Sequence, residues 1–298
     1  MTMIEPAAYA AHEHLVRDAR VRPDLWRLLV GLVIVCALYL AANTVLFAAI
    51  GALIPPTQAQ GFLRGTSPLA TFVLLASFGF LTIGVAVAAK QMQQRSLWAI
   101  LGERRLAISQ FIRVLVALVV LGLALAALPP YGMGDPLTQN LAFSTWIVLL
   151  PFAAGAVLIQ TSAEEILFRG YLQQSLAARF RSPLIWVGVP SALFAAGHYA
   201  PGIAGDNALL VAVWSCVFGV LAADLTARSG TLGPAIALHF FNNVISLLII
   251  SLPDTLSGLA LFVLPYDMSD GGVLRQWLWV DFGSMMVCWL TARLVIRR

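Results

Sequence analysis

Residues 159–172 read I-Q-T-S-A-E-E-I-L-F-R-G-Y-L and place three charged side chains, Glu164, Glu165 and Arg169, inside a long apolar segment. A charge at the depth of a lipid bilayer costs at least about 2.5 kcal/mol, so three together indicate a functional site. On a helix, Glu165 and Arg169 are four residues apart and share a face, so we expect them to pair. Glu164 is turned by about 100° from Glu165 and is free to face another element.

The composition of the whole chain indicates a membrane protein. Of its 298 residues, 60% are hydrophobic and 11% are charged, against about 25% charged residues in a typical soluble domain. The mean hydropathy is +0.88. We therefore predict an all-α fold, a polytopic helical membrane protein. The apolar stretch after the N-terminus is too long for the core of a signal peptide, so we expect it to be retained as the first span.

We expect a cytoplasmic leader at residues 1–24 and one domain of eight transmembrane helices at residues 25–298. The expected spans are residues 25–54, 68–90, 113–128, 143–180, 183–199, 208–227, 231–252 and 277–296. The fourth is too long for one upright crossing of about 20 residues, so it must tilt, kink or protrude.

Two stretches between these spans are expected at the membrane surface. In residues 91–112, Arg95, Arg104 and Arg105 alternate with apolar side chains. This pattern is typical of a helix that lies in the headgroup layer. Residues 256–264 are apolar but too short to cross, so we expect an interfacial or re-entrant segment.

The basic residues predict the orientation of the chain. With the N-terminus inside, the inner segments hold nearly all Lys and Arg, whereas the outer loops hold Arg64, Arg275 and several aspartates, Asp135 among them. This asymmetry predicts an even number of spans with both termini cytoplasmic, as in a bacterial inner-membrane protein. No basic run of the kind that binds phosphate backbones occurs, so we expect the lipid bilayer, and no nucleic acid, as the surroundings of these charges.

The cysteine and leader histidine patterns predict no metal or disulfide site. Cys36, Cys216 and Cys288 each lie in an apolar run and are expected to be buried packing residues. His12 and His14 flank Glu13 without the HExxH spacing that directs two imidazoles to one metal. We expect the leader to be a solvated tail.

Two further expected spans carry polar residues that can do chemistry. The fifth contains Phe194 and His198, and the seventh contains His239 and Asn243, which share one helix face. A single intramembrane His or Asn often only forms a hydrogen bond between helices, which stabilises their packing by about 1 kcal/mol. Several polar groups on three spans are buried at least cost together, because each satisfies the others. We therefore expect Glu164 and these polar residues to converge in one polar intramembrane cavity.

The depths of the two intramembrane histidines set a condition on the fifth span. Counted at 1.5 Å per residue from the inner end of each span, His198 lies about 22 Å deep and His239 about 12 Å deep. The two can meet only if the fifth span tilts strongly or begins outside the hydrocarbon layer.

A carboxylate, two imidazoles and an amide in such a cavity suit hydrolysis. Glu164 can act as general base toward a water that His198 holds. His239 and Asn243 can donate hydrogen bonds to the oxyanion that forms on the attacked carbonyl. Glu164, His198 and His239 could instead bind a zinc ion that activates the water. Both mechanisms stay open, and the lack of HExxH slightly favours Glu-activated water without a metal or cofactor.

Taken together, the three motifs resemble those of the CPBP family of intramembrane proteases. This family comprises CAAX proteases and bacteriocin-processing or immunity proteins, with the type II CAAX prenyl endopeptidases as its eukaryotic branch. The resemblance covers about residues 160–244 and rests on EExxxR at Glu164, FxxxH ending at His198, and HxxxN starting at His239.

The resemblance implies an intramembrane endopeptidase, either glutamate-type or metal-dependent. By family analogy, Glu164 and His198 activate the water, and His239 and Asn243 form the oxyanion site. The residues implied in supporting roles are Glu165, Arg169 and Phe194. The implied substrate is a membrane-associated peptide or protein. Bacteria generally do not prenylate CAAX cysteines, so we do not expect a CAAX tail as the natural substrate.

Two other functions stay open. One is a non-catalytic immunity or partner-stabilising membrane protein of the same fold, against which the intact motifs argue. The other is a proton-coupled transporter in which Glu164 and Glu165 relay protons. Transporters often contain inverted repeats, and the sequence shows no internal repeat.

Overall fold

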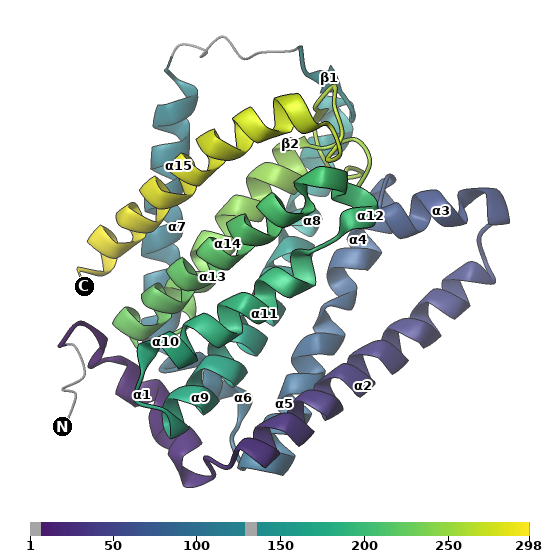
Figure 1. The fold of residues 1–298 in the computed structure, drawn as a ribbon. Coiled ribbons are helices and arrows are strands. Elements are labelled where there is room, and N and C mark those ends of the chain that lie inside the picture. Colours follow the sequence, from purple (N-terminus) through teal and green to yellow (C-terminus); the bar gives the residue numbers. More distant parts are fainter. Residues whose placement is uncertain (1–6, 129–135, 298) are drawn as a thin grey trace.

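The computed structural model describes residues 7–128 and 136–297. The start of the expected leader (residues 1–6), residues 129–135 after the third expected span, which include Asp135, and the terminal Arg298 lie outside the described residues. The described part of the chain is helical, apart from one small sheet (Figure 1).

Six stretches of the described chain are long and apolar enough to cross a membrane, which confirms a polytopic membrane protein. They are Leu25–Gly51, Pro68–Gln93, Arg104–Ala126, Phe143–Arg179, Pro201–Ser229 and Leu274–Ile296. Two shorter apolar stretches, Pro183–His198 and Gly233–Ile249, correspond to the expected fifth and seventh spans.

The helices that build these stretches have the following bounds. They are α1 (His12–Val16), α2 (Leu25–Gly51), α3 (Pro56–Arg64), α4 (Pro68–Ser77), α5 (Gly79–Gln93), α6 (Leu97–Leu101), α7 (Arg104–Ala126), α8 (Phe143–Glu165), α9 (Gln173–Arg179), α10 (Pro183–Trp186), α11 (Gly188–His198), α12 (Pro201–Ala204), α13 (Ala208–Ser229), α14 (Gly233–Val244) and α15 (Gly271–Ile296). Short 3-10 turns lie at Ala7–Tyr9, Arg17–Val21 and Gly205–Asn207, and π-helical turns at Ile166–Leu172 (η3) and Ile245–Ile249 (η5).

The fourth span is one continuous helical rod. It runs from α8 through the π-helical turn η3 into α9 and contains 37 residues. At 1.5 Å per residue this is about 55 Å, far more than the hydrocarbon thickness of about 30 Å. The rod must therefore tilt or protrude from the membrane, as the sequence predicts.

The connector before the third span differs from the expected headgroup-layer helix. Within residues 91–112, α5 ends at Gln93, α6 follows, and α7 begins at Arg104. Glu103 caps α7 by accepting hydrogen bonds from the backbone N–H groups of Arg105 (2.9 Å) and Leu106 (2.6 Å). Arg104 and Arg105 thus belong to the first turn of the spanning helix. Arg95 is 2% exposed and donates to Gln174, so its expected position among headgroups is wrong.

The stretch expected at the interface, residues 256–264, is part of a loop with a small sheet. The strands are β1 (Thr138–Gln139), β2 (Ile250–Ser251) and β3 (Phe262–Val263), in the order β1-β3-β2. β1 pairs with β3 antiparallel, and β2 pairs with β3 in parallel. The sheet lies at the end of the bundle opposite α1 (Figure 1).

Small residues allow close approach at the helix crossings. A side chain on Gly84 of α5 would meet the backbone of Val35 on α2, and one on Gly233 of α14 would meet the backbone of Ala107 on α7. A Cβ at Gly219 of α13 would lie 2.9 Å from Cβ of Ser191 on α11. Lipid tails are as apolar as side chains, so membrane helices gain from tight packing of this kind.

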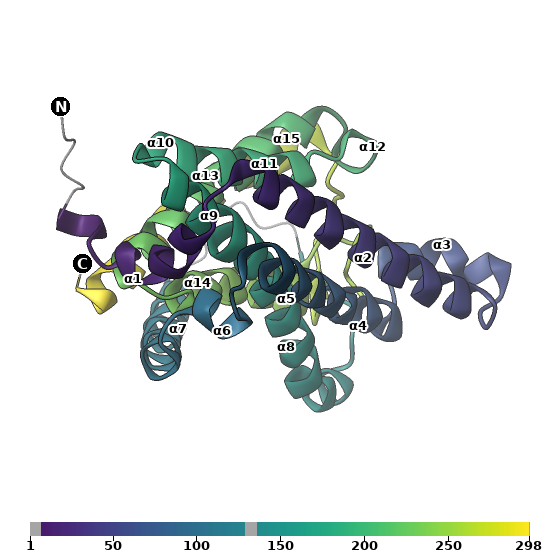
Figure 2. The same ribbon diagram turned by 90° about the horizontal axis from the view of Figure 1, so that it is seen from below.

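The N-terminal segment is packed against the bundle, so the expected solvated tail is wrong for its described part. The Tyr9 hydroxyl donates to Asp224 of α13 (2.8 Å), and the His12 ring lies 4.7 Å from that of Trp186. Leu15 and Val16 are buried. Asp224 also accepts from Trp289 of α15 (3.1 Å), so one carboxylate joins the N-terminal segment to the last helix. Figures 1 and 2 show α1 and the C-terminal end of α15 at the same end of the bundle.

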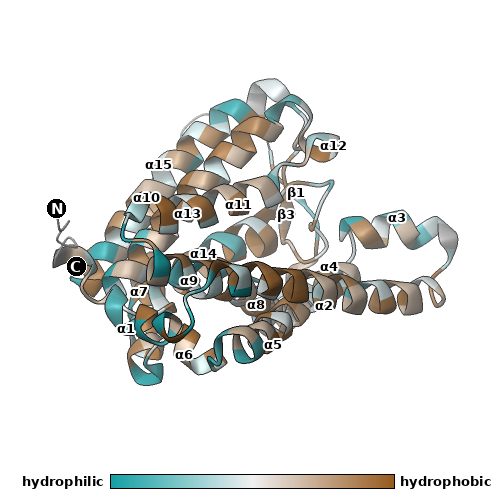
Figure 3. Ribbon diagram, turned by 60° about the horizontal axis from the view of Figure 1, so that its bottom comes forward, coloured by the Kyte–Doolittle hydropathy of each residue, from teal (hydrophilic) through white to brown (hydrophobic). Residues whose placement is uncertain are grey.

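The outward face of α2 is apolar. Figure 3 shows α2 hydrophobic over most of its length, and its exposed side chains include Leu29, Val33 and Leu40. The three cysteines are free, and Cys36 is exposed on α2 while Cys216 and Cys288 are partly buried. The expectation of a buried packing role is therefore wrong for Cys36.

The buried His12 predicts a pH-dependent docking of the N-terminal segment. Burial, with a smaller effect of the Arg20 charge, lowers the pKa of His12 from 6.5 to about 4. Between pH 4 and pH 6.5 the undocked segment therefore binds more protons than the docked segment. The free energy of docking is less favourable by about 2 kcal/mol at pH 5 than at neutral pH. Hydrogen exchange of the amides at residues 15–19, corrected for intrinsic rates, should speed up at pH 5 in the wild type.

The His12→Gln variant should lack this acceleration, and His14→Gln should retain it, because His14 is exposed. An equal pH response in wild type and His12→Gln would contradict the assignment.

The contact between Gly219 and Ser191 predicts a site that does not tolerate a larger residue. In Gly219→Val, α11 must move away from α13, and overpacking of this kind costs typically about 1–3 kcal/mol. The midpoint of thermal unfolding in detergent should fall. Gly283→Val on α15 is the matched control, since no atom lies within 4 Å of a Cβ built there. A similar fall in both variants would argue against the close crossing.

Candidate functional site

The rod of the fourth span places the EExxxR residues inside the bundle. Glu164 and Glu165 end α8, and Arg169 lies in η3. Their exposed fractions are 8%, 0% and 1%, respectively. The change from α-helix to π-helix follows directly after Glu165, and a second π-helical turn follows α14 after Val244. Single π-helical turns within helices occur frequently at functional sites, because they redirect side chains.

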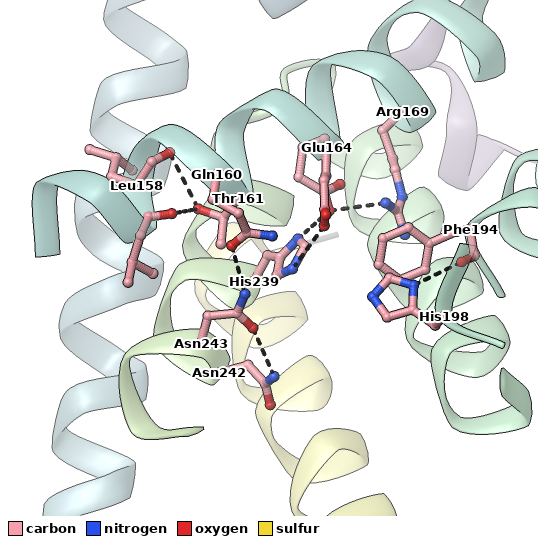
Figure 4. Close-up of polar contacts among 12 residues, drawn as sticks. Leu158, Gln160, Thr161, Glu164, Arg169, Phe194, His198, His239, Asn242 and Asn243 are labelled. Carbon is pink, nitrogen blue, oxygen red and sulfur yellow. Dashed lines mark hydrogen bonds and ion pairs between the residues drawn. The ribbon is translucent and has the colours of Figure 1, made fainter. Parts of the chain in front are cut away.

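Glu165 is the centre of a buried ionic cluster. Its Oε1 accepts from Nη1 of Arg169 at 3.0 Å and from Nδ1 of His239 at 2.8 Å. The predicted pairing of Glu165 with Arg169 is confirmed. The imidazole joins α14 to the same carboxylate, because α14 packs beside α8 (Figure 4).

The second nitrogen of His239 faces the other carboxylate. Nε2 of His239 lies 3.5 Å from Oε2 of Glu164, which is longer than a good N–H···O hydrogen bond. Among the described residues, Glu164 Oε2, Glu165 Oε2 and Arg169 Nη2 are buried without a hydrogen-bond partner. Buried polar atoms normally have partners, so these atoms can bind a substrate or a reactant.

The Phe194 ring lies between His198 and Arg169. The centroid of the Phe194 ring lies 4.3 Å from the centroid of the His198 ring and 6.0 Å from that of the His239 ring. The guanidinium carbon of Arg169 lies 4.7 Å from the same Phe194 centroid. Figure 4 shows the ring between Arg169 and His198. Within the described chain, no hydrogen bond or ion pair joins His198 to either glutamate. Its Nδ1 lies 2.8 Å from the Phe194 carbonyl oxygen.

Asn243 is held through a residue that the motifs do not contain. Its Nδ2 donates to Oε1 of Gln160 at 2.8 Å, and its Oδ1 accepts from Asn242 at 3.3 Å. Gln160 lies one turn before Glu164 and is 7% exposed. A polar residue four positions before Glu164 on an apolar helix was the signal that could have identified it.

The donor set does not fit a zinc centre. Zinc sites have at least three protein ligands, and in the described residues no three His, Cys, Asp or Glu side chains come together to hold a metal. Of the candidates Glu164, His198 and His239, Glu164 and His239 face each other at 3.5 Å, and no hydrogen bond or ion pair of the described residues joins His198 to either of them. We therefore derive no catalytic step through a metal.

Comparison with known proteins agrees with the motifs. Residues 143–245 match the family described as type II CAAX prenyl endopeptidase Rce1-like. The chain is 29% identical over 120 residues to the uncharacterized protein YyaK of Bacillus subtilis (strain 168), and this match covers 40% of either chain. No solved structure matches the chain. Residues 143–245 therefore form a domain of the Rce1-like CAAX endopeptidase family, within CPBP.

The buried cluster predicts that loss of the Glu165–Arg169 ion pair destabilises the protein far more than loss of the exposed Glu13–Arg20 ion pair. Removal of one partner from a buried pair costs about 3–5 kcal/mol, because a charge is left unpaired. Arg169→Met should therefore strongly lower the midpoint of thermal unfolding, and Glu165→Gln in the same chain should restore part of it. Arg20→Met removes the exposed pair with Glu13, whose side chains are 48% and 40% exposed, and should change stability by less than about 1 kcal/mol. Equal effects at the two sites would contradict the buried cluster.

Proposed function

We propose that the chain is an intramembrane endopeptidase that hydrolyses a peptide bond of a membrane-associated peptide or protein. The observation that carries the proposal is the buried cluster of Glu164, Glu165, Arg169 and His239, which lies within the Rce1-like domain. In this proposal the six long and two shorter apolar stretches all cross the membrane. The eight helices surround a polar cavity in a bacterial inner membrane, with both termini cytoplasmic.

His239 is proposed to meet the developing oxyanion through Nε2. Its Nδ1 is held by the carboxylate of Glu165 at 2.8 Å, and Nε2 is the ring nitrogen on the side of Glu164, 3.5 Å from Oε2. When both ring nitrogens carry hydrogen, Nδ1–H donates to Glu165 and Nε2–H can donate to the oxyanion.

Glu164 is the proposed general base. Its carboxylate takes a proton from water, the water oxygen attacks the carbonyl carbon of the substrate, and the oxyanion receives hydrogen bonds from His239 and Asn243. Glu164 then returns the proton to the leaving nitrogen as the C–N bond breaks, which yields a carboxylic acid and an amine. No serine or cysteine nucleophile takes part.

His198 is proposed to hold the attacking water. When its Nδ1–H donates to the Phe194 carbonyl, at the 2.8 Å separation of the two atoms, Nε2 is an acceptor. An acceptor of this kind can orient a water toward the carbonyl. Phe194 and the Glu165–Arg169 pair support the two histidines, because the Phe194 ring packs against both imidazoles and the guanidinium.

The proposal predicts loss of cleavage products when the cluster is altered. Membranes of cells that express wild type, Glu164→Gln, His198→Ala or His239→Ala are compared by mass spectrometry of released peptides. Product formation should fall about 100-fold or more in Glu164→Gln and His239→Ala, because each removes a group that acts on the reacting atoms.

Ser162→Ala is the matched control, since it changes a neighbouring hydroxyl that the mechanism does not use, and it should cleave like wild type. If the folded Glu164→Gln and His239→Ala variants leave the wild-type products unchanged, the site does not hydrolyse peptides. The same result would favour the non-catalytic partner protein.

A further inference from the structure

Two polar contacts connect α8 and α14, one helical turn apart. Glu164 faces His239 at 3.5 Å, and Gln160 accepts from Asn243 at 2.8 Å. Gln160 precedes Glu164 by four residues, and Asn243 follows His239 by four, so the contacts match two helices that run in opposite directions. The Gln160–Asn243 hydrogen bond is thus in register with the catalytic pair.

The turn of α8 before Gln160 is apolar. Ala156 and Val157 on the preceding turn of α8 are buried. An amide among apolar side chains costs free energy unless it is hydrogen-bonded. The side-chain oxygen Oε1 of Gln160 therefore stays hydrogen-bonded to Asn243.

The Asn243 amide has two N–H groups, and Gln160 occupies one of them. The rotation of an asparagine amide about χ2 is broad when it is not restrained. The Gln160 acceptor on one side and the Asn242 donor on the other fix the amide plane. The second N–H bond of Asn243 then points in one fixed direction, as a hydrogen-bond donor to an oxyanion must.

We propose that Gln160 is a positioning residue of the active site, which orients the amide of Asn243 for the oxyanion. The proposal rests on the endopeptidase function above. A bond that only holds helices together would support stability but not the rate of the chemical step. A substitution of Gln160 therefore distinguishes the two roles, because loss of a positioning residue lowers kcat whereas loss of a purely structural contact lowers only stability.

The activity test uses purified protein in liposomes and a quenched fluorescent peptide. The peptide spans a cleavage site found in the membrane comparison of wild type with Glu164→Gln. Gln160→Met, which keeps the length of the side chain but loses the acceptor, should lower kcat about 10-fold with little change of KM. Gln160→Glu keeps an acceptor oxygen and should stay within about threefold of wild type.

A double substitution shows whether Gln160 acts through Asn243. Gln160→Met combined with Asn243→Ala should have the same kcat as Asn243→Ala alone, because the group to be oriented is already lost. The matched control is Thr161→Val, which removes a buried hydroxyl that donates to Val157 of its own helix at 2.9 Å. It should leave kcat unchanged. An unchanged kcat in Gln160→Met, or additive losses in the double variant, would overturn the proposal.

A second measurement does not depend on catalysis. Thermal unfolding of Gln160→Met, Asn243→Leu and the double variant should give a loss in the double variant that is smaller than the sum of the single losses. Additive losses would show that the hydrogen bond is absent, and the positioning role would fall. If the bond is present but wild type and Glu164→Gln release the same peptides, the endopeptidase function fails instead.

Discussion

The carboxylate of Glu165 has no exposed surface and binds Arg169 and His239 with one oxygen. In apolar surroundings a charge must have its partners close by. This requirement fixes α8, the π-helical turn and α14 relative to one another. A slip of α14 by one turn, about 5.4 Å, would leave the buried carboxylate and guanidinium without the imidazole.

Other features of the fold maintain this register. The small residues at the helix crossings let α7 approach α14, and α11 approach α13, at backbone distance. The Phe194 ring packs between the guanidinium and His198, and it also touches His239. The two intramembrane histidines therefore flank one aromatic ring, despite the different depths that their sequence positions predict. The site depends on packing as much as on charge.

The sequence predicts the membrane class, the apolar stretches and the pairing of Glu165 with Arg169, because these follow from hydropathy and from helical spacing. It does not predict how far each helix extends beyond its apolar part. The Glu103 cap, for example, starts α7 at a charged residue. The burial of Arg95 and His12 was also missed, because both polar side chains find partners far away in the sequence. Gln160 was missed for a similar reason, since its role is visible only when α14 lies beside α8.

The contacts of Asp224 affect how the protein is made. This carboxylate accepts from Tyr9 near the start of the chain and from Trp289 near its end. During synthesis the N-terminal segment leaves the ribosome first, but its partner on α13 emerges more than two hundred residues later. The segment must wait until nearly the whole bundle has been inserted before it can pack against α13. Its docking is therefore a late step of assembly, and a chain that stops before α15 would lack one of the groups that hold the carboxylate.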